Sequence, residues 1–189
     1  MRTALWRIVP KPARIVLCLA VWLAPAWGAT LELLSLNDLI SKSTTIVQAQ
    51  VTGTSASYTG TVIYTHYKVS VLTQWKGTAQ STIDVMVPGG TAKGFRQTYP
   101  GAPQLTVGRQ YVLFLWTSSK GATYTMGFTQ GVFNLTTDAS GNITAEQMAT
   151  TETILAPGTG QVVKSQPIGM PLPQLVSAIA AGGAAGGAT

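Results

Sequence analysis

The clearest pattern in the sequence is a long stretch at residues 61–77, where apolar and polar positions alternate with a period of two. Such alternation is typical of a β-strand with one buried face and one solvated face. The face that begins at Ile63 is β-branched and aromatic, and we expect it to face the core. The opposite face carries Tyr64, His66 and Lys68, and we expect it to face solvent. A strand of this length favours a bend, which lets it serve both sides of a barrel.

Shorter runs of the same kind predict the partner strands of this stretch, at residues 45–54, 81–87, 111–116, 124–128, 131–136 and 143–146. Between the first two strands, residues 53–60 predict a polar loop. Residues 111–116 are apolar throughout, which indicates a central strand buried on both faces. Residues 138–142, with the sequence DASGN, predict a hairpin turn between the last two strands.

Short helices are expected near both ends of this region. Residues 31–43 predict a helix in which Ser35 and Asp38 form a loose capping box. Beyond Ala156 glycine and proline recur, and residues 172–180 predict a second short helix. A Gly/Ala tail at residues 181–189 is expected to be disordered.

The N-terminal 28 residues are typical of a secretory signal peptide. Four basic residues precede an apolar run at residues 15–24, and small residues then lead to a cleavage site between Gly28 and Ala29. The apolar run is about half the roughly 20 residues that a membrane span needs. We therefore expect an exported protein, periplasmic or secreted, without a stable membrane span after cleavage.

Length, composition and charge narrow the choice of function. A chain of 189 residues suits one domain, and 10% charged residues with many glycines suit a turn-rich β-protein. Four of the twelve basic residues lie in the signal segment, so the remainder has eight bases against six acids. This near-neutral charge argues against a nucleic-acid partner.

The candidate chemistry is sparse. Cys18 is the one cysteine and lies in the signal segment, which excludes disulfides and thiolate sites from the mature chain. The six acids are scattered along the chain, and there is a single histidine. We therefore expect no metal and no cofactor. The sequence does not single out partners that would complete a Ser-His-Asp triad around His66. The Ser-Lys-Ser run at residues 41–43 is explained by its position at a helix end, where Lys42 faces the helix dipole.

The best candidates for ligand binding are Tyr64, His66 and Lys68, which share the outward face of the long strand. Aromatic rings on a strand face stack on ligands, and a basic side chain orients them. The same residues also fit an ordinary solvated strand face, because single exposed aromatic side chains are common. A protein or glycan ligand is the partner that this face predicts.

The order of these elements resembles that of a known group of domains. A short helix leads into the strand IVQAQV at residues 46–51, the long strand ends in Trp75-Lys76-Gly77, and VGRQYVLFL follows at residues 107–115. This order resembles exported bacterial proteins of unknown function and, more distantly, the OB-fold domains of netrin modules and TIMP-like metalloproteinase inhibitors. The resemblance spans roughly residues 34–135. It implies an all-β fold, a small OB-like Greek-key barrel with short flanking helices.

The resemblance has limits that bear on function. Those domains are rich in cysteine, and the inhibitors use an N-terminal cysteine, whereas the mature chain here is expected to begin with Ala29. We therefore extend the fold, at residues 29–155, and not the inhibitory residues. Residues 156–180 are expected to form a Pro/Gly-rich segment whose short C-terminal helix lies against the barrel. The favoured function is a non-catalytic binding domain. A protease-inhibitor-like module that acts through a loop at residues 89–103, and a hydrolase with a spatially assembled Ser or carboxylate site, remain alternatives.

Overall fold

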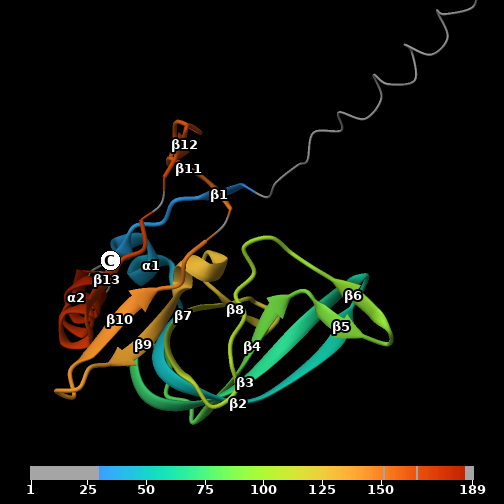
Figure 1. Cartoon of the computed structure of the whole chain (residues 1–189), viewed down its shortest axis with the longest axis horizontal. Helices are drawn as coiled ribbons and strands as arrows, with labels where there is room; N and C mark the ends of the chain where they lie inside the picture. Colours follow the sequence, from blue (N-terminus) through green and yellow to red (C-terminus); the bar gives the residue numbers. More distant parts are fainter. Residues whose placement is uncertain (1–29, 151, 165, 186–189) are drawn as a thin grey trace, which may run out of the picture.

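The computed structural model describes residues 30–150, 152–164 and 166–185 (Figure 1). The predicted signal peptide, Cys18 and the cleavage site between Gly28 and Ala29 lie outside these residues. In the described part, strands dominate and the α-helices are α1 (Leu36–Lys42) and α2 (Leu172–Ala185). The prediction of an all-β fold is therefore confirmed.

The strands follow one another along the chain, with a 3-10 turn, η2 (Phe128–Gly131), before β9. They are β1 (Thr30–Glu32), β2 (Thr45–Thr59), β3 (Val62–Lys76), β4 (Thr82–Pro88), β5 (Gly90–Ala92), β6 (Phe95–Gln97), β7 (Gln110–Thr117), β8 (Thr123–Thr125), β9 (Val132–Thr137), β10 (Ile143–Gln147), β11 (Thr153–Leu155), β12 (Val162–Val163) and β13 (Gly169–Pro171).

The main sheet has the order β13-β10-β9-β7-β2-β3-β4-β8, and β8 also pairs with β7. The pairings therefore link β7, β2, β3, β4 and β8 in a ring. Within the ring, β4 and β8 are parallel and the other pairs are antiparallel. Outside it, β9 and β10 form the predicted hairpin around residues 138–142, whose turn is held by two backbone N–H groups that donate to the Asp138 carboxylate.

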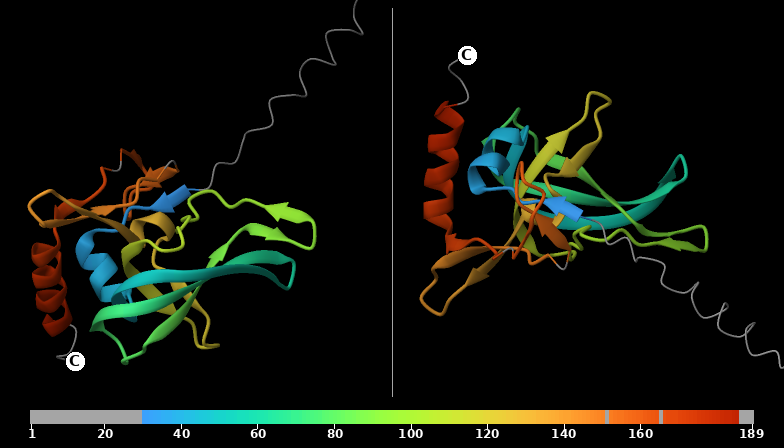
Figure 2. Two further views of the ribbon diagram at one scale, coloured as in Figure 1. Left: turned by 60° about the horizontal axis from the view of Figure 1, so that its bottom comes forward. Right: turned by 90° about the horizontal axis from the view of Figure 1, so that it is seen from above.

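The prediction of a polar loop at residues 53–60 is wrong. Strand β2 continues to Thr59, and only Gly60 and Thr61 turn the chain into β3. Gly60 has φ +62°, the left-handed conformation that two-residue hairpin turns require. The tip of this hairpin projects away from the helices (Figure 2). Its serines and threonines are exposed, and they continue the strand.

The apolar side chains form two clusters that meet at β7. Tyr111, Leu113 and Leu115 belong to the cluster inside the ring, with Val47, Val69 and Val85 among its other members. Val112 and Phe114 belong to the cluster beneath the two helices. The prediction that this strand is buried on both faces is confirmed from residue 111 to residue 115, whereas Trp116 at its end is 44% exposed.

Helix α1 begins at the predicted capping box. The Asp38 backbone N–H donates to Ser35 Oγ at 3.1 Å, and the Ser35 backbone N–H donates to the Asp38 carboxylate at 3.1 Å. The Ser35 hydroxyl also donates to the Asp38 carboxylate, and this bond, followed by the bond from the Ser35 backbone N–H and by Lys42, lowers the pKa of Asp38 below its ordinary value. The helix starts later than the predicted residue 31, because residues 30–32 form β1, which pairs with β11.

The Lys76-Gly77 pair that ends the long strand joins it to α1. The Lys76 ammonium donates to the carbonyl oxygens of Ile40 at 2.6 Å and Ser41 at 3.2 Å, near the C-terminal end of the helix. Cations at this position satisfy free carbonyl groups and interact well with the helix dipole. Gly77 has φ +94°, and a Cβ there would lie 2.7 Å from the carbonyl oxygen of Thr44.

The C-terminal segment packs against the main sheet and α1. Strand β13 pairs with β10, and Leu175 and Ile179 of α2 are buried in the cluster that α1 also covers. The helix predicted at residues 172–180 runs on to Ala185, so the predicted disordered tail begins later than residue 181; residues 186–189 lie outside the description. Gly182 lets the extended helix lie close to Ile40 of α1, because a Cβ at this position would lie 2.8 Å from the Ile40 side chain. Among the described helices, none combines the length and the hydropathy that crossing a bilayer demands.

Replacing Gly77 by alanine should destabilise the fold strongly. The substitution adds both left-handed strain, about 1–2 kcal/mol, and a steric clash with Thr44. Gly121 is the matched control, because it has φ +83° but a Cβ there would meet no other atom within 4 Å. In urea unfolding, the free energy of unfolding should fall by at least about 1 kcal/mol more in G77A than in G121A. Equal losses would mean that the close approach to Thr44 has no energetic effect.

Ser35→Ala should remove about 0.5–2 kcal/mol of stability at neutral pH by deleting the helix cap. Folding lowers the pKa of Asp38, so the unfolded chain binds the proton first on acidification. The stabilisation is therefore present above the ordinary aspartate pKa and is lost as the pH falls through the folded pKa. Urea unfolding at a series of pH values should show that the difference in free energy of unfolding between wild type and S35A becomes smaller in acid. Ser41→Ala, on the same helix, is the control and should keep the wild-type pH dependence.

Candidate functional site

The outward face of β3 carries Tyr64, His66 and Lys68 side by side, as predicted, but they line two different depressions. His66 and Lys68 line a pocket of about 540 Å³ over β2, β3 and β4, here called the polar pocket. Tyr64 lines a groove of about 480 Å³ over β3, β4, β7 and β8, here called the aromatic groove. The structure therefore separates the three candidate residues into an aromatic part and a polar part.

The polar pocket contains a chain of hydrogen bonds centred on His66. Its Nδ1 lies 2.8 Å from Asp84 Oδ2, and its Nε2 lies 2.9 Å from Ser57 Oγ. The imidazole is 22% exposed and the Asp84 carboxylate 58% exposed, so the ring is the more enclosed partner. Lys68 lines the same pocket. A hydroxyl, an imidazole and a carboxylate are thus arranged in series on three adjacent strands.

The carboxylate determines the direction of these bonds. An ionised carboxylate only accepts hydrogen bonds, so His66 Nδ1 must donate to Asp84. In the neutral ring Nε2 is then the acceptor, and the Ser57 hydroxyl donates to it. Ser57 is therefore the hydroxyl whose proton points at a base. This is the order of roles found in nucleophilic Ser-His-Asp sites.

The residues around His66 come together through diagonal contacts across the sheet. His66 is directly opposite Ser55 on β2 and Met86 on β4, and its ring reaches Ser57 and Asp84 one pair further along each strand. Diagonal neighbours lie within reach of long side chains. Ser57 was not among the predicted site residues, because residues 53–60 were expected to form a loop. The alternation continues from Gly53 to Thr59 and is followed by a glycine at the turn. This signal could have placed Ser57 on a strand.

The aromatic groove is built on three rings from three strands. Tyr124 of β8 lies between Trp116 of β7, at 6.0 Å and nearly parallel, and Tyr64 of β3, at 6.1 Å and tilted. The ladder pairings explain this order, because Tyr124 pairs with Trp116 on one side and with Met86 on the other. Burial raises the pKa of Tyr64 above its ordinary value, and the neighbouring Tyr124 and Tyr99 raise it further. Its phenol therefore stays neutral.

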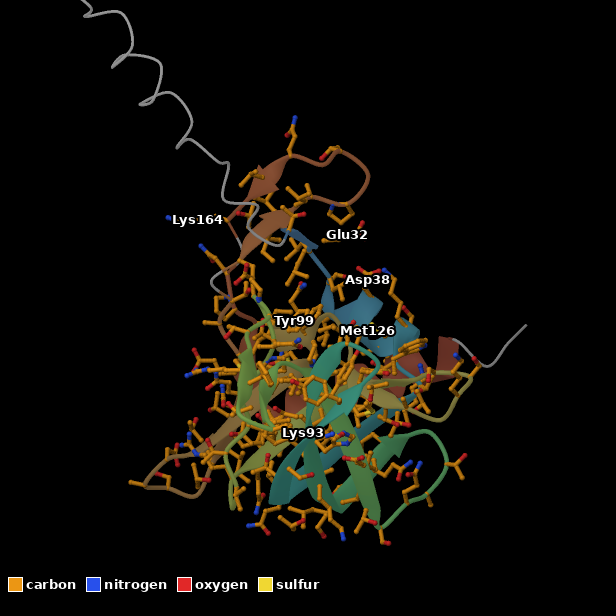
Figure 3. All side chains as sticks on the ribbon, turned by 90° about the vertical axis from the view of Figure 1, so that its right-hand side faces the viewer. Glu32, Asp38, Lys93, Tyr99, Met126 and Lys164 are labelled. Carbon is orange, nitrogen blue, oxygen red and sulfur yellow. The ribbon has the colours of Figure 1, made fainter. Side chains whose placement is uncertain are left out.

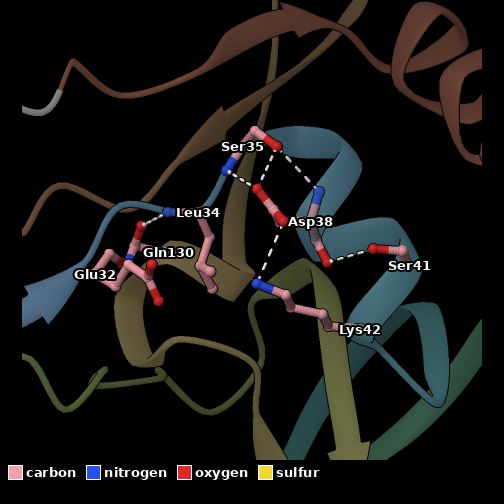
Figure 4. A network of polar contacts seen from close by, with 7 residues as sticks. All are labelled: Glu32, Leu34, Ser35, Asp38, Ser41, Lys42 and Gln130. Atoms are coloured by element: carbon pink, nitrogen blue, oxygen red, sulfur yellow. Dashed lines mark hydrogen bonds and ion pairs between the residues drawn. The ribbon is translucent and has the colours of Figure 1, made fainter. Parts of the chain in front are cut away.

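The segment before α1 forms the other wall of the groove, and Gln130 holds it in place. Gln130 is 3% exposed, and its side-chain oxygen accepts from the Leu34 backbone N–H at 2.8 Å. Its side-chain nitrogen donates to the carbonyl of Glu32 at 3.0 Å. Figure 4 shows these bonds beside the start of α1, and Figure 3 labels Glu32 and Met126, which both line the groove. The groove thus has a fixed wall.

The backbone at the end of the groove is strained. Phe128 has φ +59°, a left-handed conformation that costs a bulky residue about 1–3 kcal/mol. The preceding Gly127 has φ +61°, and a Cβ there would lie 2.5 Å from Leu34 Cδ1. Such strain persists only where the surrounding structure imposes it, and it is concentrated at ligand sites. These two residues follow the groove-lining Met126 directly.

Other candidate sites from the sequence do not assemble. Lys42 forms an ion pair with Asp38 at 3.3 Å, and the Ser41 hydroxyl donates to the Asp38 carbonyl, so the Ser-Lys-Ser run is part of the helix end. Over the described ranges there is no group of three or more His, Cys, Asp or Glu side chains arranged to hold a metal ion.

Comparison of the chain with models of protein families, with curated proteins and with solved structures found no match. The likeness to netrin modules and TIMP-like inhibitors therefore stays a prediction from short sequence motifs. The functional argument has to be made from the two depressions themselves.

Asp84→Ala should release the ring orientation of His66. In the wild type, the neutral ring should carry its hydrogen on Nδ1, because Asp84 accepts from that atom. Ring ¹⁵N chemical shifts from NMR distinguish the two tautomers. The variant should lose the preference, whereas Thr82→Ala, in the same pocket and strand, should keep it. A wild-type ring protonated on Nε2 would contradict the geometry.

Proposed function

We propose that the chain is an exported binding domain with an OB-type barrel, whose partner places a bulky apolar side chain in the aromatic groove. The observation that carries this proposal is the groove itself, with Tyr64, Tyr124 and Trp116 along one wall. Exposed apolar surface that is contiguous and hollowed is characteristic of interaction sites. Trp116, at 44% exposure, is the ring most available to a partner.

The pairing of the strands supports the OB-type barrel. Five strands, β7, β2, β3, β4 and β8, are linked in a ring, and the short helix α1 precedes the first of them in the chain. A five-stranded, Greek-key barrel that binds ligands across a strand face is the OB arrangement. The groove lies on the outward face of β3 and β4, two adjacent strands of the ring.

The lining of the groove favours a protein partner over a glycan. It is dominated by aromatic rings and leucines, with the methionines Met86 and Met126 at two sides. Methionine adapts its shape and is common at surfaces that accept apolar side chains. A glycan needs several free polar groups at close spacing, and the side chain of the lining residue Gln130 is already bonded to the backbone of Leu34 and Glu32. An aromatic or aliphatic anchor side chain is the occupant that fits.

The polar pocket lies one step further along the same face. Tyr64 and His66 are two residues apart on β3, as are Met86 and Asp84 on β4, which places the two depressions about 7 Å apart along the strands. An extended partner segment that anchors in the groove therefore continues over His66 and Lys68. This arrangement makes all three residues of the predicted face part of one binding surface.

Trp116→Ala should weaken partner binding by at least about tenfold, because it removes a central aromatic contact. The test is photo-crosslinking in envelope extract and culture supernatant of the native organism, with a photoreactive side chain at position 116. Leu72 is the matched control position, since it is 48% exposed on the same face of β3 but lines neither depression. A defined protein crosslinked from 116 and not from 72, whose binding W116A weakens, supports the proposal. Crosslinks to glycan, or equal yields at both positions, contradict it.

A second candidate, the loop-mediated protease inhibitor, is favoured by one observation. The β5–β6 hairpin projects beside the tip of β2–β3 (Figure 2), and Phe95 on it is 68% exposed. Gln97 fixes the hairpin, because its side chain accepts from the Ile63 N–H at 2.7 Å and donates to the Thr61 carbonyl at 2.9 Å. An ordered loop with an exposed apolar side chain is what a protease subsite accepts.

If the hairpin inhibits a protease, Phe95→Ala should raise the inhibition constant by at least about tenfold. A panel of secreted proteases assayed with wild type and F95A measures this effect. Val162→Ala is the control, because Val162 is 73% exposed on the separate β11–β12 hairpin. Absence of inhibition by the wild-type chain at high concentration would remove this candidate.

A further inference from the structure

We propose that Ser57, His66 and Asp84 form a nucleophilic catalytic site that cleaves short-chain carboxylic esters. The hydroxyl-to-imidazole distance of 2.9 Å and the imidazole-to-carboxylate distance of 2.8 Å are both within hydrogen-bond range. The two ring nitrogens are used in the order that general-base catalysis requires. This inference uses the polar pocket and does not depend on the aromatic groove.

The roles follow from the contacts of each residue. Ser57 is exposed on β2 and supplies the nucleophilic oxygen. His66 accepts its proton at Nε2, and Asp84 holds the ring with Nε2 facing Ser57 and stabilises the imidazolium that forms. Ser57 is the serine that touches the base, whereas Ser55 also lines the pocket and has no hydrogen bond to His66 among the described contacts.

The reaction balances without any further reagent except water. Ser57 Oγ attacks the ester carbonyl carbon and its proton passes to His66 Nε2; the tetrahedral intermediate then expels the alcohol, which takes that proton. Water next attacks the acyl-serine, giving its proton to Nε2, and the carboxylic acid leaves as the proton returns to Ser57 Oγ. The net change is ester plus water to acid plus alcohol.

The surroundings determine which substrates fit and how fast they react. The pocket is an open surface depression lined mostly by polar side chains, so it offers little apolar surface to a long acyl chain and suits a small acyl group such as acetyl. Ser57 lies within the β2–β3 ladder and not at a helix start. Lys68 also lines the pocket, but it is opposite Gly53, four residues along β2 from Ser57, so none of the described contacts places a donor at the oxyanion. Loss of a single preorganised donor costs other hydrolases about 100- to 1,000-fold. We therefore expect slow turnover and a clear acylation step.

The test is acylation of the full-length chain by p-nitrophenyl acetate, quenched in acid and mapped by peptide mass spectrometry. The wild type and the matched control Ser55→Ala should both be acetylated at Ser57. Ser57→Ala should lose this adduct, and His66→Gln should form it at least about 100-fold more slowly, as loss of a general base predicts. Asp84→Asn should also slow it, because the ring loses its preferred tautomer.

The controls make each outcome decisive. Circular dichroism of every variant establishes that it is folded, which substitutions at these surface positions should allow. Leu72→Ala, at an exposed position that lines neither depression, should be acetylated like the wild type. The assay needs no protein partner, so failure of the binding proposal would not affect this result. Absence of acetyl-Ser57 in the folded wild type, or equal rates in wild type and His66→Gln, would overturn the proposal. Equal acetylation of Ser55 and Ser57 would also overturn it, because it would show chemical labelling without a base.

Discussion

The structure depends on one strand, β7, that is buried on both faces. Its alternate side chains, Leu113 and Phe114 for example, enter different clusters, one inside the ring of strands and one beneath the helices. Each fully buried side chain of this size contributes about 1.5–3 kcal/mol, so five consecutive buried residues make β7 a large local source of stability. The strand pairs with β2, β8 and β9, and thus fixes the positions of both halves of the molecule.

The same strand explains where the aromatic groove lies. Side chains on its outer face are covered by the helices as far as Phe114, and the cover ends before Trp116. The uncovered indole stacks on Tyr124, which extends the apolar surface toward β3 and β4. Gln130 then encloses this surface by holding the segment before α1 in place. The aromatic groove is therefore the region where the second apolar cluster reaches solvent.

The sequence predicted the parts of the fold that depend on local pattern. The alternation of β3, the continuous apolar run of β7 and the Ser35 cap of α1 each leave a periodic or motif signal. The site was predicted less well, because its geometry depends on the register between strands. Tyr64, His66 and Lys68 were placed on the correct face, but the contacts of His66 with Ser57 and Asp84 come from strand neighbours that are 9 and 18 residues away. Polar serines and threonines at the hairpin tip also resemble a loop, which concealed Ser57.

The hairpin turn controls which residues meet in the polar pocket. Ser57 and His66 lie on the two strands that the turn at Gly60 and Thr61 joins, so the turn length sets which serine meets the imidazole. A shift of one residue in register would move every β2 side chain to the other face and remove Ser57 from the pocket. The irregularity in register between Val51 and Gly53 is further from the turn than Ser57. The pairing from Gly53 to Thr59 is therefore regular up to the turn. A short glycine turn beyond the main core therefore positions the Ser57 hydroxyl beside His66.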